Sequence, residues 1–382
     1  MPSRSGISPS ASSAADAPVV AEELRVRDRL DEGAWRSFVD TQPDGNIFHT
    51  PEMARVFERT KHHRSTVLAA TDSSGFPHAL IAPVEVALIG GPVRSWTSRA
   101  VAYGGLLCSD DVPGRAGARQ LLAEHRRATG RRSLFTELRH LSDASFLRGI
   151  LEADGFSHED HLNFHIDLER PEDGLWRGLS KTAQQRVRSG QRKGVVMEEV
   201  SGEPDLDQTY SLLCDVYKRV GVPLAHRSLF SAAQSILHPL GMFKVFAARL
   251  DERIVATRYV LLYKGRILDW YAGADRAFAS SSPSEVLVWQ ILRWGQEHGY
   301  RIFDFGGAGR PDEPYGPRAF KAKFGGTLVN FGRDVLVHAP IRLRLSRSGY
   351  VVGRRLVWHR ADTRKPNTID SARPSERSLR SG

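Results

Sequence analysis

The sequence predicts an α+β protein built from two similar units with mixed sheets. Its 382 residues are enough for two domains. An order of several strands, one helix and a further strand occurs twice along the chain. Gly104 lies about thirty residues before a predicted strand with Phe135, and Gly273 lies about thirty residues before one with Phe303. We interpret this repetition as a structural duplication, and a single α+β domain of many strands is the alternative.

Composition points to an ordinary globular protein. Hydrophobic residues make up 41% and charged residues 26% of the chain. No apolar run approaches the ~20 residues of a membrane span. The Ser, Ala and Pro-rich start lacks a signal-peptide core, so we expect a disordered tail over residues 1–22 and a cytoplasmic location, with a peripheral position at the inner face of the membrane as the alternative. Cys108 and Cys214 stand in apolar contexts and are read as buried thiols.

The positive charge is concentrated at one end. The net charge is +10, but eleven basic and three acidic residues from position 341 onward contribute +8 of it. The remaining 340 residues are nearly neutral. The overall charge therefore does not by itself indicate a nucleic-acid-binding domain.

The first half reads as a helix pair, a meander of strands and a helix with a closing strand. Thr50 is a good N-cap and Pro51 fits the first position of the second helix. Apolar residues then alternate with a period of two between Gly-rich turns. We predict helices over 31–40, from 51 and over 114–129, strands over 64–70, 78–88, 93–96, 101–107 and 133–138, and a turn with a strand over 154–168.

Three histidines follow, at positions 158, 161 and 165, with Glu159 and Asp160 between them. On a helix this spacing would bring the imidazoles to one face, as in a metal site. However, residues 163–168 alternate like a strand, which divides the set between two faces. We therefore predict no metal here.

Residues 176–193 read as a basic amphipathic helix. At 100° per residue its cations fall within about 60° of one another, and no acidic residue lies between Gly174 and Met197. Such a stripe binds phosphates well, although a solvated helix face is the alternative. The apolar face comprises Trp176, Leu179, Ala183 and Val187, and the cationic stripe comprises Arg177, Lys181, Arg188 and Arg192.

The second half repeats the strands, helix and strand. Ser282 reads as the N-cap of its central helix, and Glu285 as the partner that closes a capping box. We predict helices over 205–220, 228–237 and from 283, and strands over 243–250, 254–263, 266–271, 300–305 and 327–337. A basic helix from residue 341 would lie on an anionic membrane surface or pack on the first domain.

An ordered set of motifs near the C-terminus adds a resemblance. The set is Tyr271-Ala272-Gly273, then Phe303-Asp304-Phe305-Gly306-Gly307, then Phe320-Lys321 with Phe324-Gly325. It resembles the C-terminal signature of the Fem family of aminoacyl-tRNA-dependent peptidyl transferases, over roughly residues 35–345. The resemblance implies two tandem GNAT-like domains, that is, two copies of the acyl-CoA N-acyltransferase fold. We place them at 23–165 and 166–326, with a return segment at 327–360 and a basic tail at 361–382.

The resemblance also implies site residues. Lys321 would stabilise the oxyanion that forms when an amine attacks the ester of an aminoacyl-tRNA, and Phe320 would wall the site. Asp304 would hold the incoming ammonium or accept its proton, with capping of the glycine turn as the alternative. Tyr271, Tyr103 and Arg227 are the candidate acceptor-binding residues.

The basic stripe matches a Lys- and Arg-rich helix of Fem relatives at Lys181, Arg188 and Arg192. The first arginine of that pattern is Gln184 here. Relatives also carry an aromatic residue and a lysine, facing the sugar-peptide precursor, in the helix that opens at Thr50. This chain has Met53 and no lysine before Lys61.

Three functions compete on this basis. The first is transfer of an amino acid from aminoacyl-tRNA to an amine of a peptidoglycan precursor or related acceptor, by a monomer without a metal or cofactor. The second is an acyl-CoA-dependent N-acyltransferase, although no Arg/Gln-x-x-Gly-x-Gly/Ala loop enters a helix here. The third is a non-catalytic basic protein that binds RNA or membrane.

Overall fold

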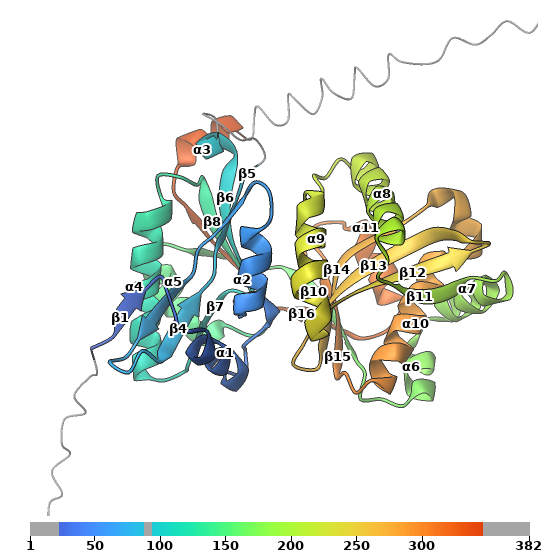
Figure 1. The fold of residues 1–382 in the computed structure, drawn as a ribbon, viewed down its shortest axis with the longest axis horizontal. Coiled ribbons are helices and arrows are strands. Elements are labelled where there is room, and N and C mark those ends of the chain that lie inside the picture. The colour runs from blue at the N-terminus through green and yellow to red at the C-terminus, as the bar shows by residue number, and fades with distance from the viewer. Residues whose placement is uncertain (1–22, 88–93, 347–382) are drawn as a thin grey trace, which may run out of the picture.

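The computed structural model describes residues 23–87 and 94–346, which form two lobes side by side (Figure 1). Each lobe is built around the same unit, a pair of parallel neighbouring strands joined by a helix that crosses over between them. The predicted duplication is therefore confirmed. The units are β6 (Ser98–Tyr103), α4 (Val112–Thr129) and β8 (Phe135–Arg139), and β14 (Arg266–Ala274), α10 (Pro283–Glu297) and β15 (Ile302–Gly307).

The first lobe contains two sheets, and α4 packs its small and leucine side chains against the smaller one. The smaller sheet has the order β1 (Arg25–Arg27), β3 (Leu68–Thr71), β4 (Pro77–Ile81) and β7 (Leu106–Cys108). The larger has the order β2 (His63–Ser65), β5 (Val84–Ala87), β6, β8, β17 (Arg333–Val337) and β9 (Ser157–Glu159). The other helices are α1 (Glu32–Thr41), α2 (Pro51–Glu58), α3 (Arg94–Thr97) and α5 (Arg148–Ala153), with a 3-10 turn at Ile47–His49.

The second lobe is one seven-stranded sheet with helices on both faces. One face carries α6 (Glu172–Gly178), α7 (Lys181–Arg192) and α10, and the other carries α8 (Glu203–Val220) and α9 (Arg227–Ile236). The strand order is β11 (Val196–Val200), β12 (Phe243–Leu250), β13 (Arg253–Tyr263), β14, β15, β10 (Leu162–Asp167) and β16 (Thr327–Asn330).

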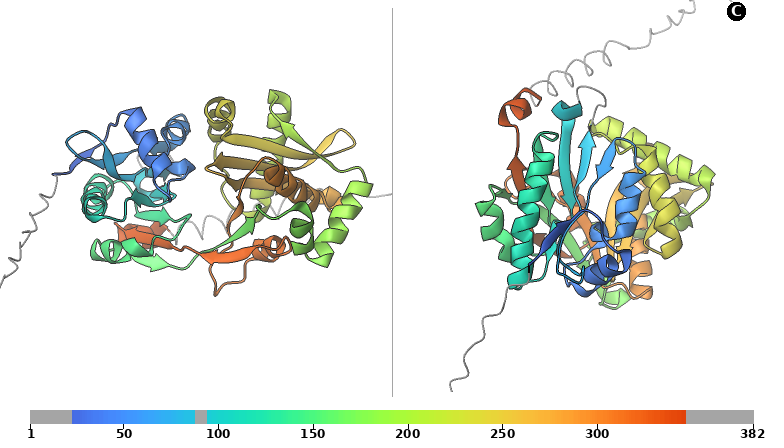
Figure 2. Two further views of the ribbon diagram at one scale, coloured as in Figure 1. Left: turned by 90° about the horizontal axis from the view of Figure 1, so that it is seen from below. Right: turned by 60° about the vertical axis from the view of Figure 1, so that its left-hand side comes forward.

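The chain crosses between the lobes twice, before β10 and after β16, and these crossings correct the predicted domain boundaries. The boundary placed between residues 165 and 166 falls inside β10, which pairs along its whole length with the second sheet. The strand predicted over 327–337 is two strands. It breaks at Phe331-Gly332, where Gly332 has φ +70°, so that β16 stays in the second sheet and β17 joins the first. Figure 2 shows both crossings on the same side of the molecule.

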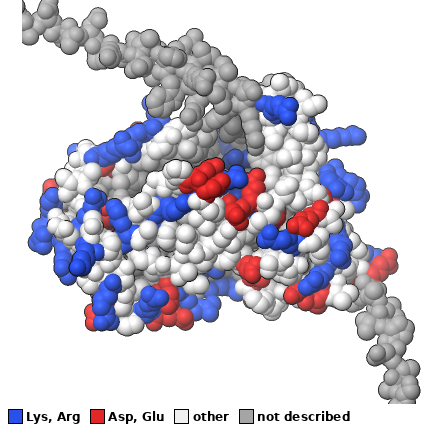
Figure 3. All heavy atoms as spheres, turned by 180° about the vertical axis from the view of Figure 1, so that it is seen from behind, with Lys and Arg blue, Asp and Glu red and all other residues white. Residues whose placement is uncertain are grey.

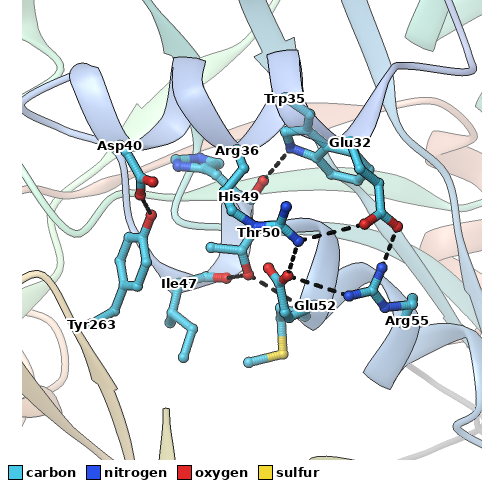
Figure 4. Close-up of polar contacts among 11 residues, drawn as sticks. Glu32, Trp35, Arg36, Asp40, Ile47, His49, Thr50, Glu52, Arg55 and Tyr263 are labelled. Atoms are coloured by element: carbon cyan, nitrogen blue, oxygen red, sulfur yellow. Dashed lines mark hydrogen bonds and ion pairs between the residues drawn. The ribbon is translucent and has the colours of Figure 1, made fainter. Parts of the chain in front are cut away.

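The lobes are held together by a shared apolar core and by a polar contact. Met53 of α2 is fully buried in a cluster that also contains Leu229 and Phe230 of α9. Beside it, the Tyr263 hydroxyl of the second lobe donates to Asp40 of α1 (Figure 4). Burial of a large apolar side chain contributes ~1.5–3 kcal/mol, so these contacts hold the two lobes together.

The opening of α2 follows the sequence prediction and is reinforced by charges. The Thr50 hydroxyl accepts a hydrogen bond from the Met53 amide, as an N-cap should. Glu52 is buried and accepts from both Arg36 and Arg55 (Figure 4). Met53 therefore faces the core rather than a substrate.

Several predicted elements differ in the structure. The segment 93–96, predicted as a strand, contributes to helix α3. The strands predicted over 64–70 and 78–88 each divide between the two sheets of the first lobe, and the second divides at Pro83, which has no amide to donate to a ladder. The capping box of α10 is absent, because Ser282 has φ +49° and makes no side-chain cap, and Glu285 pairs with Arg186 instead.

The end of the described chain leaves some predictions outside it. A helix begins at Pro340, in agreement with the predicted basic helix. Its continuation beyond residue 346 and the tails at 1–22 and 361–382 lie outside the described residues. Within residues 23–87 and 94–346, no helix combines the length and the hydropathy that a membrane crossing needs.

Candidate active site

A cavity of about 630 Å³ lies between the lobes. The first lobe contributes side chains from the ends of β6 and β8 and from the start of β17. The second lobe contributes β14, the end of β15 and helix α11 (Gly316–Ala322). Of the predicted site residues, Lys321, Phe320, Tyr271 and Tyr103 all line this cavity. Residues more than 200 positions apart in the sequence thus share one space.

The cavity reaches into the second sheet because two parallel strands separate there. β14 and β15 pair only from Arg266 opposite Ile302 to Leu268 opposite Asp304. Both strands continue beyond this point, β14 to Ala274 and β15 to Gly307, without pairing to each other. Backbone groups that would bond across a continuous ladder are therefore available at the floor of the cavity.

The ammonium group of Lys321 is bound at the end of β15. Its Nζ donates to the carbonyl oxygens of Phe305 at 2.6 Å, Gly307 at 2.7 Å and Gly306 at 3.3 Å. Burial lowers the pKa of Lys321 to about 8, although the negative charge of Asp269 acts in the opposite direction. Lys321 is therefore a cation that is only partly solvated and lies close to its protonation midpoint at mildly alkaline pH.

The Phe-Lys and Phe-Gly motif has a local structural reason. Phe324 is buried in the core of the second lobe, and its ring lies 5.2 Å from that of Phe320. Gly325 has φ +77° and approaches the backbone of Gly178 so closely that a Cβ atom would lie 2.7 Å from the Gly178 oxygen. A larger residue does not fit there. The motif thus fixes α11, and with it Lys321, against the turn between α6 and α7.

A buried ion pair lies next to Lys321 and was not predicted from the sequence. Arg258 of β13 donates to Asp269 Oδ2 on β14, and both side chains are less than 10% exposed. Asp269 Oδ1 is buried and has no hydrogen-bond partner among the described residues. Burial raises the pKa of Asp269 against the opposing effects of Arg258 and Lys321. Asp269 lines the cavity, has one unpartnered acceptor atom and is more basic than an ordinary aspartate.

Sequence signals could have pointed to this pair. Arg258 and Asp269 are each the charged residue in the middle of an otherwise apolar strand, and the two strands form a hairpin closed by Lys264-Gly265. Asp269 lies opposite Val260, so it is the diagonal neighbour of Arg258 on the same face. A bulge at Trp270 establishes this register, and no pattern of local residues predicted the bulge.

Asp304 does not reach the cavity, which corrects its predicted role as a catalytic group. Its side chain is fully buried, accepting from the Gly306 amide at 2.8 Å and from Arg266 at 3.2 Å, with His165 Nε2 also 3.2 Å away. Burial pushes its pKa upward, but His165, Arg266 and the Gly306 amide outweigh it and hold the pKa below the usual range. Asp304 secures the glycine turn, which was the alternative reading.

Tyr103 and Tyr271 approach each other across the lobe boundary. The guanidinium of Arg139 lies 5.1 Å from the ring centroid of Tyr103. Burial and the proximity of Tyr103 raise the pKa of Tyr271, against the effect of Arg139. The Tyr271 hydroxyl therefore stays protonated at neutral pH and can donate to a bound molecule.

Arg227 lies elsewhere, and its predicted role in the same site is wrong. It is 44% exposed at the start of α9, and two carboxylates of α8, Asp207 and Glu203, hold it there. It lines a separate cavity at α8 and α9 of the second lobe, together with Phe230 and Ser231. The three histidines weighed as a metal site are divided, since His158 pairs with Asp334 while His165 lies against Asp304.

A second cavity, of about 510 Å³, lies on the other side of α11. It is lined by the end of β14 and the start of α10. Arg258, Ala272, Pro317 and Phe320 line both cavities, so these residues form the partition between them. Two separate molecules could enter from opposite sides and meet at this partition.

The cationic stripe predicted on one helix is divided between two helices. The helix breaks at Leu179, and Ser180 caps a new helix, so Arg177 belongs to α6 and the other three cations to α7. Lys181, Arg188 and Arg192 are exposed on one face of α7, and Arg188 stacks on Trp176. Among the described residues none of these cations forms an ion pair. Figure 3 shows Lys and Arg side chains gathered at the left-hand end of the molecule, where the second lobe lies.

Helix α7 is linked to both the second cavity and the Lys321 segment. Arg186 of α7 lines that cavity and pairs with Glu285 of α10 at 2.7 Å. The amide of Ser180, at the start of α7, donates to the Lys323 carbonyl at 2.8 Å. The exposed cationic face therefore begins directly beside the partition.

Comparisons with known proteins agree with this architecture. Residues 178–317 match the model of the acetyltransferase (GNAT) domain family. A search of curated protein sequences finds no match. The structure is similar to the crystal structure of FemX, with a TM-score of 0.65, 13% sequence identity, and coverage of 84% of this chain and 99% of that one.

Two further solved structures are similar over the same extent. L-PGS from Bacillus licheniformis has a TM-score of 0.55 and 15% identity, covering 84% of this chain and 97% of that one. A tandem GNAT protein from the clavulanic acid biosynthesis pathway has a TM-score of 0.52 and 12% identity, covering 83% and 99%. The chain thus has the α+β fold of two tandem GNAT-like domains with mixed sheets, and the resemblance to the Fem family is confirmed in its fold.

Proposed function

We propose that this protein is an acyltransferase that moves an amino acid from aminoacyl-tRNA to the amine of an acceptor. The observation that carries the proposal is the pair of cavities separated by Phe320 and Arg258, with Lys321 lining the central cavity next to Phe320. A transfer between two large substrates needs two approaches to one reacting centre. The acceptor would occupy the cavity between the lobes, and the acyl donor would occupy the cavity beside α10.

The reaction at the partition would need no metal. The acceptor nitrogen would attack the ester carbonyl carbon, the carbon–oxygen bond to the ribose would break, and the ribose hydroxyl would leave. Lys321 would stabilise the oxyanion of the tetrahedral intermediate, most readily by exchanging its long 3.3 Å contact with the Gly306 carbonyl. Its charge is present below a pKa of about 8.

Asp269 would accept the proton that the acceptor amine must lose. An amine enters as an ammonium and must lose a proton before it can attack. The unpartnered Oδ1 of Asp269 could bind that ammonium, and its raised pKa suits it to accept the proton. Arg258 would hold the carboxylate in position through Oδ2. This assignment gives Asp269 the role that the sequence suggested for Asp304.

A polynucleotide donor is favoured over a small one by the surface next to the second cavity. Lys181, Arg188 and Arg192 form an exposed cationic face on the helix whose Arg186 lines that cavity. Each phosphate neutralised there would release counterions and strengthen binding. An acyl-CoA donor would fit the same cavity but would leave this face of α7 without a role. The acceptor class we propose is a peptidoglycan precursor or a related amine.

Product analysis by mass spectrometry tests the proposal. The purified chain would be incubated with a mixture of aminoacylated tRNAs or with acyl-CoA, each together with a peptidoglycan precursor and with simple amines. We expect an amide product that gains an amino-acid residue, formed only with charged tRNA. Transfer from acyl-CoA alone would replace the proposed donor, and the absence of any amide product would overturn the function.

A further inference from the structure

We infer that the first-lobe wall of the central cavity, formed by Arg99, Arg139 and Arg333, binds an oxyanion group of the acceptor, either a carboxylate or a phosphate. This inference rests on the proposed function and specifies its acceptor. The acceptor would be a zwitterion, with an ammonium directed toward Asp269 and an anionic group directed toward the arginines. All three arginines line the cavity.

The arginines come together because three adjacent strands present them on one sheet face. Tyr103 of β6 lies opposite Arg139 of β8, and Arg139 lies opposite Arg333 of β17. Arg99 is four residues before Tyr103 and therefore on the same side of β6. The set depends on the crossing of β17 from the second lobe, which adds Arg333 to the sheet of the first.

The charges on this wall are not balanced. Among the described residues Glu137 is the one carboxylate that hydrogen-bonds to them, accepting from Arg139 at 2.9 Å and from Arg333 at 2.6 Å. Three cations therefore share a single anion. Arg99 forms no ion pair among the described residues, and the Nε of Arg139 is buried without a hydrogen-bond partner. A buried donor left unpaired costs free energy that a bound anion would recover.

The rest of the cavity does not supply the missing charge. Arg258 and Asp269 neutralise each other, and Lys321 adds a further cation. His161, which also lines the cavity, has its pKa lowered to about 4 by burial and by the proximity of Arg333 and Arg139, so it is neutral at pH 7. The cavity is thus electropositive, and Asp269 is the one carboxylate among the described residues that line it.

The guanidinium geometry indicates the class of anion. A guanidinium presents parallel N–H donors that match the two oxygens of a carboxylate or phosphate. Arg139 lies over the ring of Tyr103, with 5.1 Å between its guanidinium carbon and the ring centroid, and it also donates to Glu137. It is therefore oriented before a ligand arrives, which reduces the entropy lost on binding.

Three small amines can test this without any acyl donor. O-phosphoethanolamine and β-alanine carry an anion close to an ammonium, whereas propylamine has the ammonium alone. Ligand-observed NMR titration should give dissociation constants for the two zwitterions at least tenfold below that of propylamine. The tighter of the two zwitterions identifies phosphate or carboxylate as the recognised group. Equal affinity for all three amines would overturn the inference.

Arg99→Ala tests whether the anionic group binds at this wall. Arg99 is exposed, so its replacement leaves no buried partner unpaired. We expect this variant to weaken binding of the preferred zwitterion at least fivefold and to leave propylamine unaffected. The control is Arg119→Ala, which replaces an exposed arginine on α4 outside the cavity. It should change the affinity for neither the zwitterion nor propylamine. Unchanged zwitterion binding in Arg99→Ala would also overturn the inference. Intact zwitterion binding without amide formation from any donor would instead refute the proposed transferase function alone.

Discussion

The ammonium of Lys321 lies 2.7 Å from the carbonyl oxygen of Gly307 and joins the end of α11 to the end of β15. The contact places a cation where β15 has already separated from β14. The two short contacts, with the Phe305 and Gly307 carbonyls, hold the ammonium in place, so only its long contact with Gly306 has to be exchanged when negative charge develops nearby. Such preorganisation is what an oxyanion-stabilising group requires.

Replacement of Lys321 should abolish most of the activity but leave substrate binding nearly unchanged. Removal of a single oxyanion donor typically lowers kcat by about 10² to 10³. We expect a loss of this size for Lys321→Ala in single-turnover transfer assays, with the Kd for charged tRNA within about twofold of the parent. Lys218→Ala, an exposed lysine on α8, is the control. A kcat within threefold of the parent would remove Lys321 from the chemistry.

The pH dependence of the reaction should report the ionisation of Lys321. Its pKa is lowered to about 8 by burial, so its positive charge is present below that pH and lost above it. Transfer should therefore decline as pH rises through about 8. In Lys321→Arg, whose guanidinium keeps its charge, the residual activity should show no such decline. An identical alkaline limb in both proteins would assign it to another group.

Asp269→Asn should separate catalysis from stability when it is combined with a second change. Loss of the carboxylate leaves Arg258 buried and unpaired, which typically destabilises a protein by roughly 3 to 5 kcal/mol. The double variant Arg258→Gln with Asp269→Asn removes that unpaired charge and should regain much of the free energy of unfolding. Loss of a general base lowers rates by about 10² to 10⁴.

Denaturant unfolding and transfer rates measured on both proteins decide the role of Asp269. We expect the double variant to stay inactive after its stability is recovered. If activity returned together with stability, the pair would be structural and the proton would have to leave by another route.

The sequence predicted the parts of this fold that local pattern determines. The Thr50 cap, the order of strands and crossover helix in each half, and the Phe-Lys and Phe-Gly motif all depend on residues within a few positions of one another. The motif could be recognised because Gly325 must adopt φ +77° against Gly178, a constraint that limits the residue type. Lys321 was proposed because this motif carries the resemblance to the Fem family.

The remaining parts of the fold and of the site depend on contacts between residues far apart in the sequence, which no local pattern contains. The boundary at residue 165 was wrong because β10 has the same alternation whichever sheet it joins. Asp304 was proposed because it adjoins a glycine pair, a signal that equally suits a buried carboxylate accepting from the Gly306 amide. Arg139 and Arg333 are 194 positions apart, and only the crossing of β17 makes them neighbours.

The cationic face of α7 should govern the salt dependence of tRNA binding. Arg188→Ala with Arg192→Ala removes two of its exposed charges. Each phosphate contact contributes about 0.7 to 0.9 to the slope of log K against log salt, so the slope should become shallower by about 1 to 2. Gel-shift titrations across several salt concentrations measure it. The control pair Arg119→Ala with Arg131→Ala lies on the first lobe and should leave the slope unchanged, and an equal effect of both pairs would indicate nonspecific attraction.

Asp304 should matter to stability rather than to chemistry. Its carboxylate binds Arg266 and the Gly306 amide in a fully buried site, and hydrogen bonds to a charged group contribute about 1.5 to 3 kcal/mol. Asp304→Asn should lower the free energy of unfolding by that amount near pH 7, while Asp215→Asn on the exposed face of α8 should lower it by less than 0.5 kcal/mol.

The pH dependence of that loss has a defined sign. Because the folded-state pKa of Asp304 lies below the unfolded value, its contribution is fully present above the unfolded pKa and is lost as pH falls through the folded one. The difference between the parent and Asp304→Asn should therefore be constant from pH 5 to 8 and shrink below pH ~4. Denaturant titrations at several pH values measure it. A difference that grew toward acid pH would mean that burial, rather than the contacts with His165 and Arg266, controls this carboxylate.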